Sequence, residues 1–260
     1  MNFDILWLDR LDSYVKDRSM NQIFRLKNSL PLQVAIAIVG VWAISLWKCV
    51  QIRLDTLQPI WFIALFIWQT WIYTGLFIIA HDAMHGSIYP SPRVNRAIGQ
   101  FCLWFYAGFD YPQLCAKHHQ HHKYPASDRD PDFHNGQTKH FWGWFGHFVS
   151  EHITWRQVIT IISMFAAGVA ICHYFFPQPL WWQAVNLACF WVFPSLMSSL
   201  QLFYFGTFLP HREPVGGYIE PHRAETIPRS RWWSLISCYH FGYHRKHHES
   251  PQIPWWQLYE

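Results

Sequence analysis

The strongest constraint on this chain is a set of four long apolar runs, each able to cross a lipid bilayer as a helix. They cover residues 31–52, 59–81, 153–176 and 180–209. A membrane-spanning helix needs about 20 mostly apolar residues, since its backbone must satisfy its hydrogen bonds internally. A shorter apolar stretch at 97–111 predicts a partial span, either re-entrant or interfacial. The runs therefore predict an all-α integral membrane protein with four transmembrane helices.

The low charge of the chain argues against buried helices of a soluble protein. Only 14% of the residues are charged, against about 25% in ordinary soluble domains, so too few polar side chains remain to cover the runs. The polar segments at 112–152 and 210–260 are too small for separate cores, so we expect one membrane-embedded domain over residues 1–260. Residues 1–30 are charged and amphipathic, without the features of a secretory signal peptide.

Basic residues predict the orientation of the helices. They precede the first span and populate both polar segments, whereas the linker at 177–179 carries no charge and only Lys48 and Arg53 flank the other outer turn. By the positive-inside rule, both termini and a histidine-rich cap should face the cytoplasm. The net charge of +4 then reflects this bias and attraction to anionic lipid, so we expect no nucleic-acid partner.

Three short histidine motifs lie at the predicted cytoplasmic ends of the spans. HDAMH ends the second span and places two histidines at i and i+4, on one helical face. KHHQHHKYP and YHFGYHRKHHESP each contain an HxxHH spacing, which also puts three imidazoles on one face. His119 projects away from that face, while His240 lies one turn before the last motif on the same predicted face. The candidate ligands are His81, His85, His118, His121, His122, His244, His247 and His248.

The number of imidazoles predicts two metal ions. A zinc site uses three or four protein ligands, so eight histidines exceed the needs of one metal. His211, in FGTFLPHR at the exit of the last span, is a ninth candidate. Imidazole binds iron, zinc, copper and nickel alike, so the spacing does not choose the metal. The Glu-x-x-His motifs of soluble di-iron bundles are absent, and an iron site here would have to be histidine-rich.

The order HxxxH, HxxHH and HxxHH on four spans resembles the membrane fatty-acid desaturase and hydroxylase superfamily. The strings HDAMHGS, HHQHHKYPASDRDPDFH, FGTFLPHR and CYHFGYHRKHHESPQIPWWQL are similar to those of bacterial and cyanobacterial β-carotene ketolases. The resemblance covers roughly Leu76 to the C-terminus. It implies a non-haem di-iron oxygenase that uses O2 to oxidise C4 of a β-ionone ring. Two hydroxylations at one carbon and loss of water would convert β-carotene to echinenone and then canthaxanthin.

The resemblance also implies cofactors, partners and residue roles. The eight motif histidines would ligate two irons, with His211 as the ninth ligand. Metal-bound histidines usually donate their other N–H to a carboxylate or carbonyl, which makes Asp82, Asp128 and Asp130 candidate partners, with His240 as a further one. The carotenoid would enter from lipid. No flavin, dinucleotide or iron–sulfur motif occurs in the chain, so we expect a separate ferredoxin-like reductant to dock on the basic tail.

The sequence is also compatible with three other functions. A fatty-acyl desaturase or hydroxylase shares the scaffold and all three motifs, and only the ketolase-like strings oppose it. An intramembrane zinc protease could use HDAMH as a variant of HExxH, but it would leave both HxxHH motifs unexplained. A metal carrier would need ionisable groups inside the membrane, where only His173 lies deep in a span.

Overall fold

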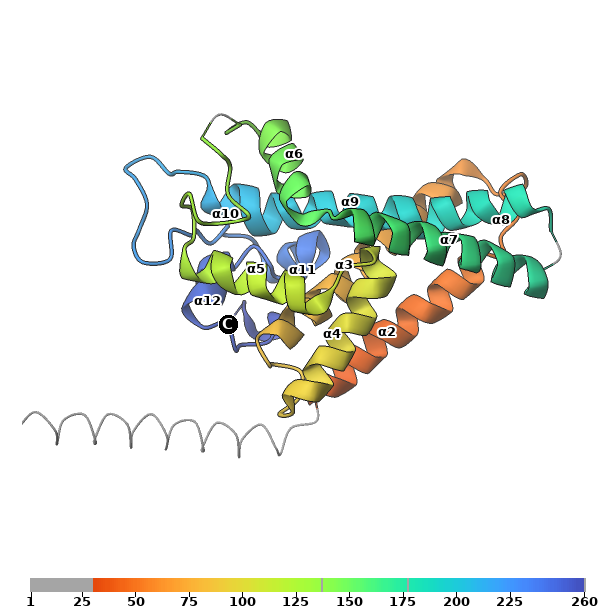
Figure 1. Ribbon diagram of the computed structural model, residues 1–260, viewed down its shortest axis with the longest axis horizontal. Helices are drawn as coiled ribbons and strands as arrows, with labels where there is room; N and C mark the ends of the chain where they lie inside the picture. The colour runs from red at the N-terminus through yellow and green to blue at the C-terminus, as the bar shows by residue number, and fades with distance from the viewer. Residues whose placement is uncertain (1–29, 137, 177, 260) are drawn as a thin grey trace, which may run out of the picture.

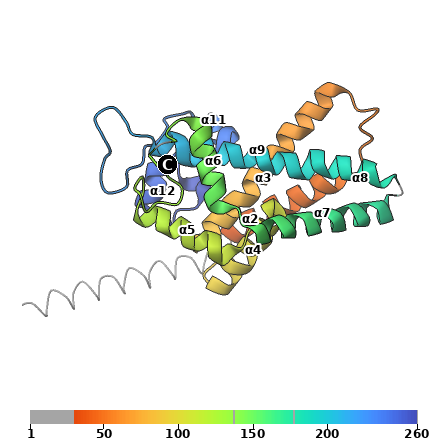
Figure 2. The ribbon, with the colours of Figure 1, turned by 45° about the horizontal axis from the view of Figure 1, so that its top comes forward.

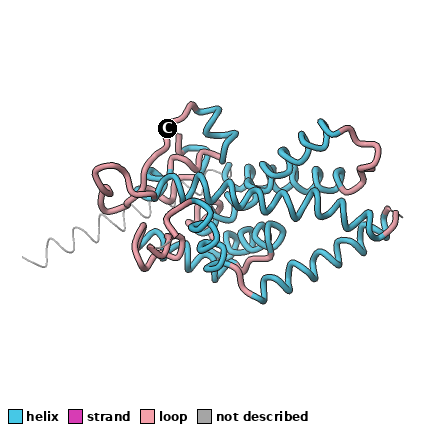
Figure 3. The backbone as a smooth tube through the Cα atoms, turned by 90° about the horizontal axis from the view of Figure 1, so that it is seen from above, coloured by secondary structure: helices cyan, strands magenta, loops and turns pink. Residues whose placement is uncertain are grey.

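The computed structural model describes residues 30–136, 138–176 and 178–259, and these residues form helices, turns and loops without a strand (Figures 1 and 3). The charged N-terminal segment expected at 1–30 lies outside the described residues, except for Leu30. The elements are α2 (Leu30–Cys49), α3 (Pro59–Met84), α4 (Pro92–Ala107), α5 (Tyr111–Lys123), α6 (Phe141–His152), α7 (Trp155–Phe175), α8 (Leu180–Leu187), η1 (Ala188–Val192), α9 (Phe193–Phe203), η2 (Tyr204–Phe208), α10 (Leu209–His211), α11 (Arg231–Cys238), α12 (His244–Glu249) and η3 (Trp255–Gln257).

The four predicted membrane helices are confirmed. They are α2, α3, α7 and a continuous helical stretch, Leu180–His211, that joins α8 to α10. The predicted bounds differ by a few residues: the first helix stops at Cys49, and the second runs on to Met84. The protein is therefore an all-α integral membrane protein. Most exposed side chains on α2 and α7, such as Ile44 and Ile162, are apolar, as a lipid-facing surface requires.

The partial span predicted at 97–111 is instead the helix α4, which begins at Pro92 and ends at Ala107. Gly108 adopts φ 67°, a left-handed conformation that suits glycine and ends the helix. Asp110 then starts α5, because its carboxylate accepts a hydrogen bond from the Gln113 backbone N–H at 2.9 Å. The chain therefore turns at this point, and α5 carries the second histidine motif away from the membrane helices (Figure 1).

Two π-helical segments interrupt the last membrane helix. Each lies just before a proline: η1 precedes Pro194, and η2 precedes Pro210. Proline has no N–H and its ring clashes with the carbonyl four residues earlier, so the widened turn relieves both problems. One extra residue in a turn rotates everything beyond it by about 100°. The orientation of His211 at the end of this helix therefore depends on η2.

Helix α3 is central, with α2, α4 and α9 packed around its second half. Tyr73, Leu76 and Ile79 of α3 are fully buried there, and Trp71 stacks on Tyr239 with ring centroids 4.5 Å apart. Helices α5, α6, α11 and α12 with their loops form a cap at one end of the membrane helices, and the α7–α8 turn lies at the other (Figures 1 and 2). The core therefore lies where α3 meets the cap.

The C-terminal segment is tied to the end of α3. The Asp82 carboxylate accepts a hydrogen bond from the Trp255 backbone N–H at 3.1 Å, and Ser87 donates to the Gln252 carbonyl at 3.0 Å. Phe241 packs against Gly206 of η2 and against the His81 ring, with centroids 4.9 Å apart. These contacts hold the third histidine motif against the first.

We predict that Gly206→Ala destabilises the protein. A Cβ at this position would overlap the Phe241 ring, and overpacking of this kind costs about 1–3 kcal/mol. Elsewhere in a helix, the same change stabilises by about 0.5–1 kcal/mol. Gly40→Ala on α2 is the control, since no atom lies within 4 Å of its Cβ position. The thermal unfolding midpoint in detergent should fall for Gly206→Ala and not for Gly40→Ala; equal midpoints would contradict the proposed contact.

Candidate metal centre

The three histidine motifs, at residues 81–85, 118–122 and 244–248, and His211 meet in two groups beneath the cap. Helix α3 brings the first motif, α5 the second, α12 the third and α10 brings His211. Within each group, one ligand atom of every histidine lies within 4.8 Å of the others. The first group is His81, His85, His118, His122 and His247, and the second is His121, His211, His244 and His248.

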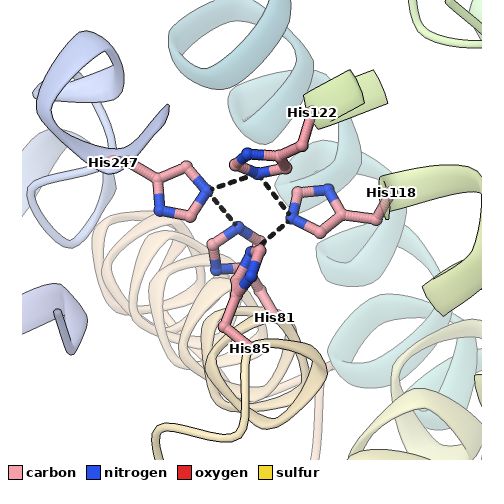
Figure 4. Close-up of side chains that lie close together, drawn as sticks. All are labelled: His81, His85, His118, His122 and His247. Atoms are coloured by element: carbon pink, nitrogen blue, oxygen red, sulfur yellow. Dashed lines mark hydrogen bonds between the residues drawn. The ribbon is translucent and has the colours of Figure 1, made fainter. Parts of the chain in front are cut away.

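The first group encloses a small space between α3, α5 and α12 (Figure 4). The Nε2 atoms of His85 and His118 are 2.7 Å apart, and those of His118 and His122 are 3.1 Å apart. His247 closes the ring, with its Nε2 2.9 Å from His122 and 3.1 Å from His81. Five imidazole nitrogens thus point toward one another.

The second group lies beside the first, on the same histidine-bearing faces of α5 and α12. The Nε2 of His248 is 3.1 Å from that of His121 and 3.1 Å from that of His244. The His211 ring packs edge-on against His121 and His244, at centroid distances of 4.7 and 4.9 Å. His122 and His248 stack at 4.2 Å, so the two groups share a wall of imidazole rings.

Each HxxHH motif divides its histidines between the two groups. On α5, the i, i+4 pair His118 and His122 joins the first group, and His121 joins the second. On α12 the division is reversed, because the i, i+4 pair joins the second group and His247 the first. The single face expected for each motif therefore contacts two sites, and α5 and α12 both bridge them.

The nitrogen atoms of both groups fit metal ions. A neutral imidazole has one donor and one acceptor nitrogen, so a ring of facing Nε2 atoms cannot satisfy itself by hydrogen bonds. A metal about 2 Å from two neighbouring nitrogens holds them about 3 Å apart, which is close to the spacing found here. His211 donates from Nδ1 to the Arg223 carbonyl at 2.9 Å, and its buried Nε2 has no hydrogen-bond partner among the described residues.

Burial keeps the cap histidines in the form that binds metal. It lowers the pKa of each of these imidazoles, and the neighbouring imidazoles lower it further. The affected residues are His85, His118, His122, His244, His247 and His248. A histidine binds a metal ion only in its deprotonated form. These rings are already neutral, so they can bind a metal ion without losing a proton.

His121 differs because two carboxylates lie beside it. Its Nδ1 donates to Asp130 at 2.9 Å, and Asp130 also accepts the backbone N–H groups of Ala126 and Asp132. Burial lowers the pKa of His121, but the charges of Asp130 and Asp132 outweigh it and raise that pKa to about 9. A carboxylate on Nδ1 leaves Nε2 facing the second group and makes it a stronger ligand.

The other three predicted partners lie in different surroundings. Asp82 is buried, and one of its oxygens lies 3.5 Å from Nδ1 of His81. Asp128 is exposed and belongs to neither group. His240 does not share the helical face of His244, as we expected, because α12 starts only at His244. Tyr239 and His240 adopt left-handed φ values of 47° and 62°, which place His240 in a turn, with its ring against Tyr259.

Two further residues, His119 and Asp132, lie close to the histidine groups. His119 is exposed on α5 and bonds to the Cys115 carbonyl at 2.7 Å. Asp132 was not among the predicted residues, yet one of its oxygens lies 3.8 Å from His121 Nδ1 and the other 3.1 Å from His152 Nε2. Asp132 could have been found in the sequence from its position two residues after Asp130 in the DRDPD string.

An apolar pocket adjoins the first group. Its walls come from α3, α4, α5, α6 and α9, and His81 and His118 lie in one wall. The remaining lining is Phe77, Met84, Tyr106, Phe109, Leu114, Asp132, Phe148, His152, Ser199 and Leu202. A larger hollow shares Phe109, Leu114 and His152 with this pocket. A hydrocarbon group in the pocket would therefore lie beside the histidines.

Comparison with known proteins places these features in a family. A model of the fatty acid desaturase family matches residues 59–156 and 137–260. The chain is 44% identical over 192 residues to a beta-carotene ketolase of Paracoccus sp. (strain PC1), covering 73% of this chain and 74% of that one. It is 34% identical to a beta-carotene ketolase of Haematococcus lacustris, covering 87% and 77%, and 32% identical to the zeaxanthin 4-ketolase of Chlamydomonas reinhardtii, covering 88% and 50%. No solved structure matches significantly.

We predict that the purified chain holds about two transition-metal ions, one in each group. His211→Ala should lower this to about one, since it removes one of the four nitrogens of the second group. His119→Ala is the matched control and should retain the wild-type content. Elemental analysis of detergent-purified protein measures both variants. A loss of metal in His119→Ala equal to that in His211→Ala would contradict the grouping.

Asp130→Asn tests the carboxylate behind His121. Removal of such a partner typically weakens metal binding about 10–100-fold. We expect this loss in the second group, measured as the concentration of a competing chelator that removes half of the metal. Asp128→Asn, at an exposed acid in the same loop, should behave as the wild type. If the chelator concentration that removes half of the metal is unchanged in Asp130→Asn, the hydrogen bond between Asp130 and His121 stabilises the loop and does not strengthen metal binding.

Proposed function

This chain belongs to the fatty acid desaturase family, and from that premise we propose that it is a β-carotene ketolase that acts at C4 of β-ionone rings. The observation that carries the reaction class is the apolar pocket whose wall contains His81 and His118 of the first histidine group. The substrate is inferred from the similarity to beta-carotene ketolases over 73% and 87% of the chain.

We propose iron as the metal of both histidine groups. Bound by the nine imidazoles, two irons would supply the activation of O2 needed to attack the allylic C4–H bond. The imidazoles are neutral donors in a buried setting, and Asp130 places a negative charge behind one of them. The cap and the membrane helices keep the groups out of bulk water, since all nine histidines are buried or partly buried.

The reaction consists of two hydroxylations at one carbon. Each consumes O2, two electrons and two protons, inserts one oxygen atom into a C4–H bond and releases one water. The resulting geminal diol loses water to leave the ketone. One ring of β-carotene so converted gives echinenone, and conversion of the second ring gives canthaxanthin.

The chain contributes binding, orientation and exclusion of water. Phe77, Met84 and Leu202 present an apolar surface that suits a hydrocarbon ring, and the wall containing His81 and His118 is where its reacting carbon would face. The neighbouring hollow, which includes Trp104 and Trp155, would lead the long polyene toward lipid. Tryptophan is common at membrane interfaces, which agrees with a lateral entrance there.

We infer that the cap faces the cytoplasm and receives electrons from a separate ferredoxin-like protein. The support is the excess of lysine and arginine in the cap segments over the outer turns. Arg229, Arg231, Arg245 and Lys246 lie on or beside α11 and α12, close to the third motif. Arg245 is paired with Glu249 at 2.9 Å, so the others supply more of the free positive charge. An acidic electron carrier would find a complementary surface there.

Expression in cells that accumulate β-carotene tests the proposed function. We expect new ketocarotenoids in the presence of O2, and none with His244→Ala, because that variant removes a nitrogen of the four-histidine group. His119→Ala should still produce them. Carotenoids and membrane lipids are both measured by chromatography and mass spectrometry. Unchanged carotenoids with altered acyl chains would overturn the proposal in favour of a fatty-acyl desaturase or hydroxylase.

A further inference from the structure

The apolar pocket beside the first histidine group has a polar wall made by Asp132 and His152. The two side chains are 15% and 6% exposed, and both line the pocket. His152 ends α6, and Asp132 lies in the loop before that helix. A pocket for a pure hydrocarbon needs no carboxylate, because burying an unpaired charge costs free energy. This wall therefore requires another explanation.

The geometry holds the pair in place. Nδ1 of His152 donates to the Phe148 carbonyl at 2.8 Å, which directs its Nε2 toward Asp132. The indole N–H of Trp144 donates to the Asp132 carbonyl at 2.8 Å and fixes the loop against α6. Two interactions within the protein thus orient the side chains before any ligand arrives.

One atom of the pair has capacity left for a ligand. Nε2 of His152 lies 3.1 Å from Oδ1 of Asp132, without the alignment of a hydrogen bond. Oδ1 is buried and has no hydrogen-bond partner among the described residues. A buried acceptor left unpaired costs about 1–3 kcal/mol, so a donor from a ligand would be favourable.

We propose that Asp132 and His152 form a binding site for a hydroxyl group on the ring that occupies the pocket. The hydroxyl would donate to Oδ1 of Asp132 or to Nε2 of His152, which can accept because Nδ1 carries the ring proton. This inference rests on the proposed ketolase function and deepens it. Two hydroxyls share this chemistry: the C4 alcohol formed by the first hydroxylation, and a hydroxyl already present at the adjacent C3.

The site has a consequence for the product. An unoxidised ring makes no hydrogen bond to the pair, whereas the C4 alcohol does, so the pocket binds the intermediate more tightly than the substrate. Slower release gives the second hydroxylation time to occur at the same carbon. The site would therefore favour release of the ketone over release of the alcohol.

Variants of His152 test the proposal, because His152 belongs to neither histidine group. His152→Leu removes the polar nitrogen, and His152→Gln keeps an amide that can accept. His147→Leu is the matched control, since His147 lies on the same helix and is not part of the pocket lining. Each protein, checked for metal content and monodispersity, is supplied with O2, reductant and either β-carotene, 4-hydroxy-β-carotene or zeaxanthin.

With β-carotene, we expect His152→Leu to raise the ratio of released C4 alcohol to ketone about tenfold, the effect of losing one hydrogen bond. His152→Gln should restore part of the ratio, and His147→Leu should keep the wild-type value. The KM for 4-hydroxy-β-carotene should rise more than its kcat falls. A larger KM change for zeaxanthin than for 4-hydroxy-β-carotene identifies the C3 hydroxyl as the ligand, and the opposite result identifies the C4 alcohol.

Equal effects of His152→Leu on all three carotenoids, with an unchanged product ratio, would overturn the hydroxyl site. Binding measured without O2, by quenching of tryptophan fluorescence, separates this outcome from failure of the proposed function. A wild-type chain that prefers hydroxylated carotenoids, with the preference lost in His152→Leu, supports the site even without turnover. If the wild type shows no such preference, the hydroxyl site is rejected. Ketolase activity is tested separately, by expression in cells that accumulate β-carotene.

Discussion

The convergence of nine imidazole nitrogens on two points is the arrangement on which the rest of the structure depends. Lone pairs that face one another at 2.7 to 3.1 Å repel unless a cation lies between them, and burial removes the option of protonation by water. Such an arrangement persists only where neighbouring groups hold it. The Asp130 carboxylate behind His121 and the Arg223 carbonyl behind His211 orient individual rings. The cap as a whole fixes the helices that carry them.

Helix α3 links this arrangement to the membrane. Its buried second half packs against α2, α4 and α9, and its last turn carries the first motif into the cap. The third motif, 163 residues or more along the chain, is held to it by the Asp82 contact with the Trp255 backbone and by Phe241 against Gly206. Membrane packing and the histidine groups are therefore parts of one rigid unit. The apolar pocket lies where they meet, with His81 and His118 in its wall.

Much of the fold and most of the candidate site could be predicted from the sequence, since the signals were local. Apolar runs of membrane length predicted the four helices within a few residues, and the i, i+3 and i+4 spacings identified eight of the nine histidines that the structure groups. His211 was predicted separately, from its place at the exit of the last span. Two predictions were wrong, because the conformation at those positions does not follow the local sequence pattern. The apolar stretch at 97–111 breaks at Gly108, and His240, which helical periodicity placed beside His244, lies in a left-handed turn.

The sequence by itself determined an all-α membrane protein with paired histidine motifs, because hydropathy and helical periodicity depend only on neighbouring residues. Tertiary structure alone decided which histidine belongs to which group, since the histidine-bearing face of α5 and that of α12 each contact both groups. It also decided that His211 reaches the second group, through the π turn before Pro210, and that Asp132 and His152 share a pocket wall. Those outcomes depend on contacts between segments far apart in the chain, which no local pattern encodes.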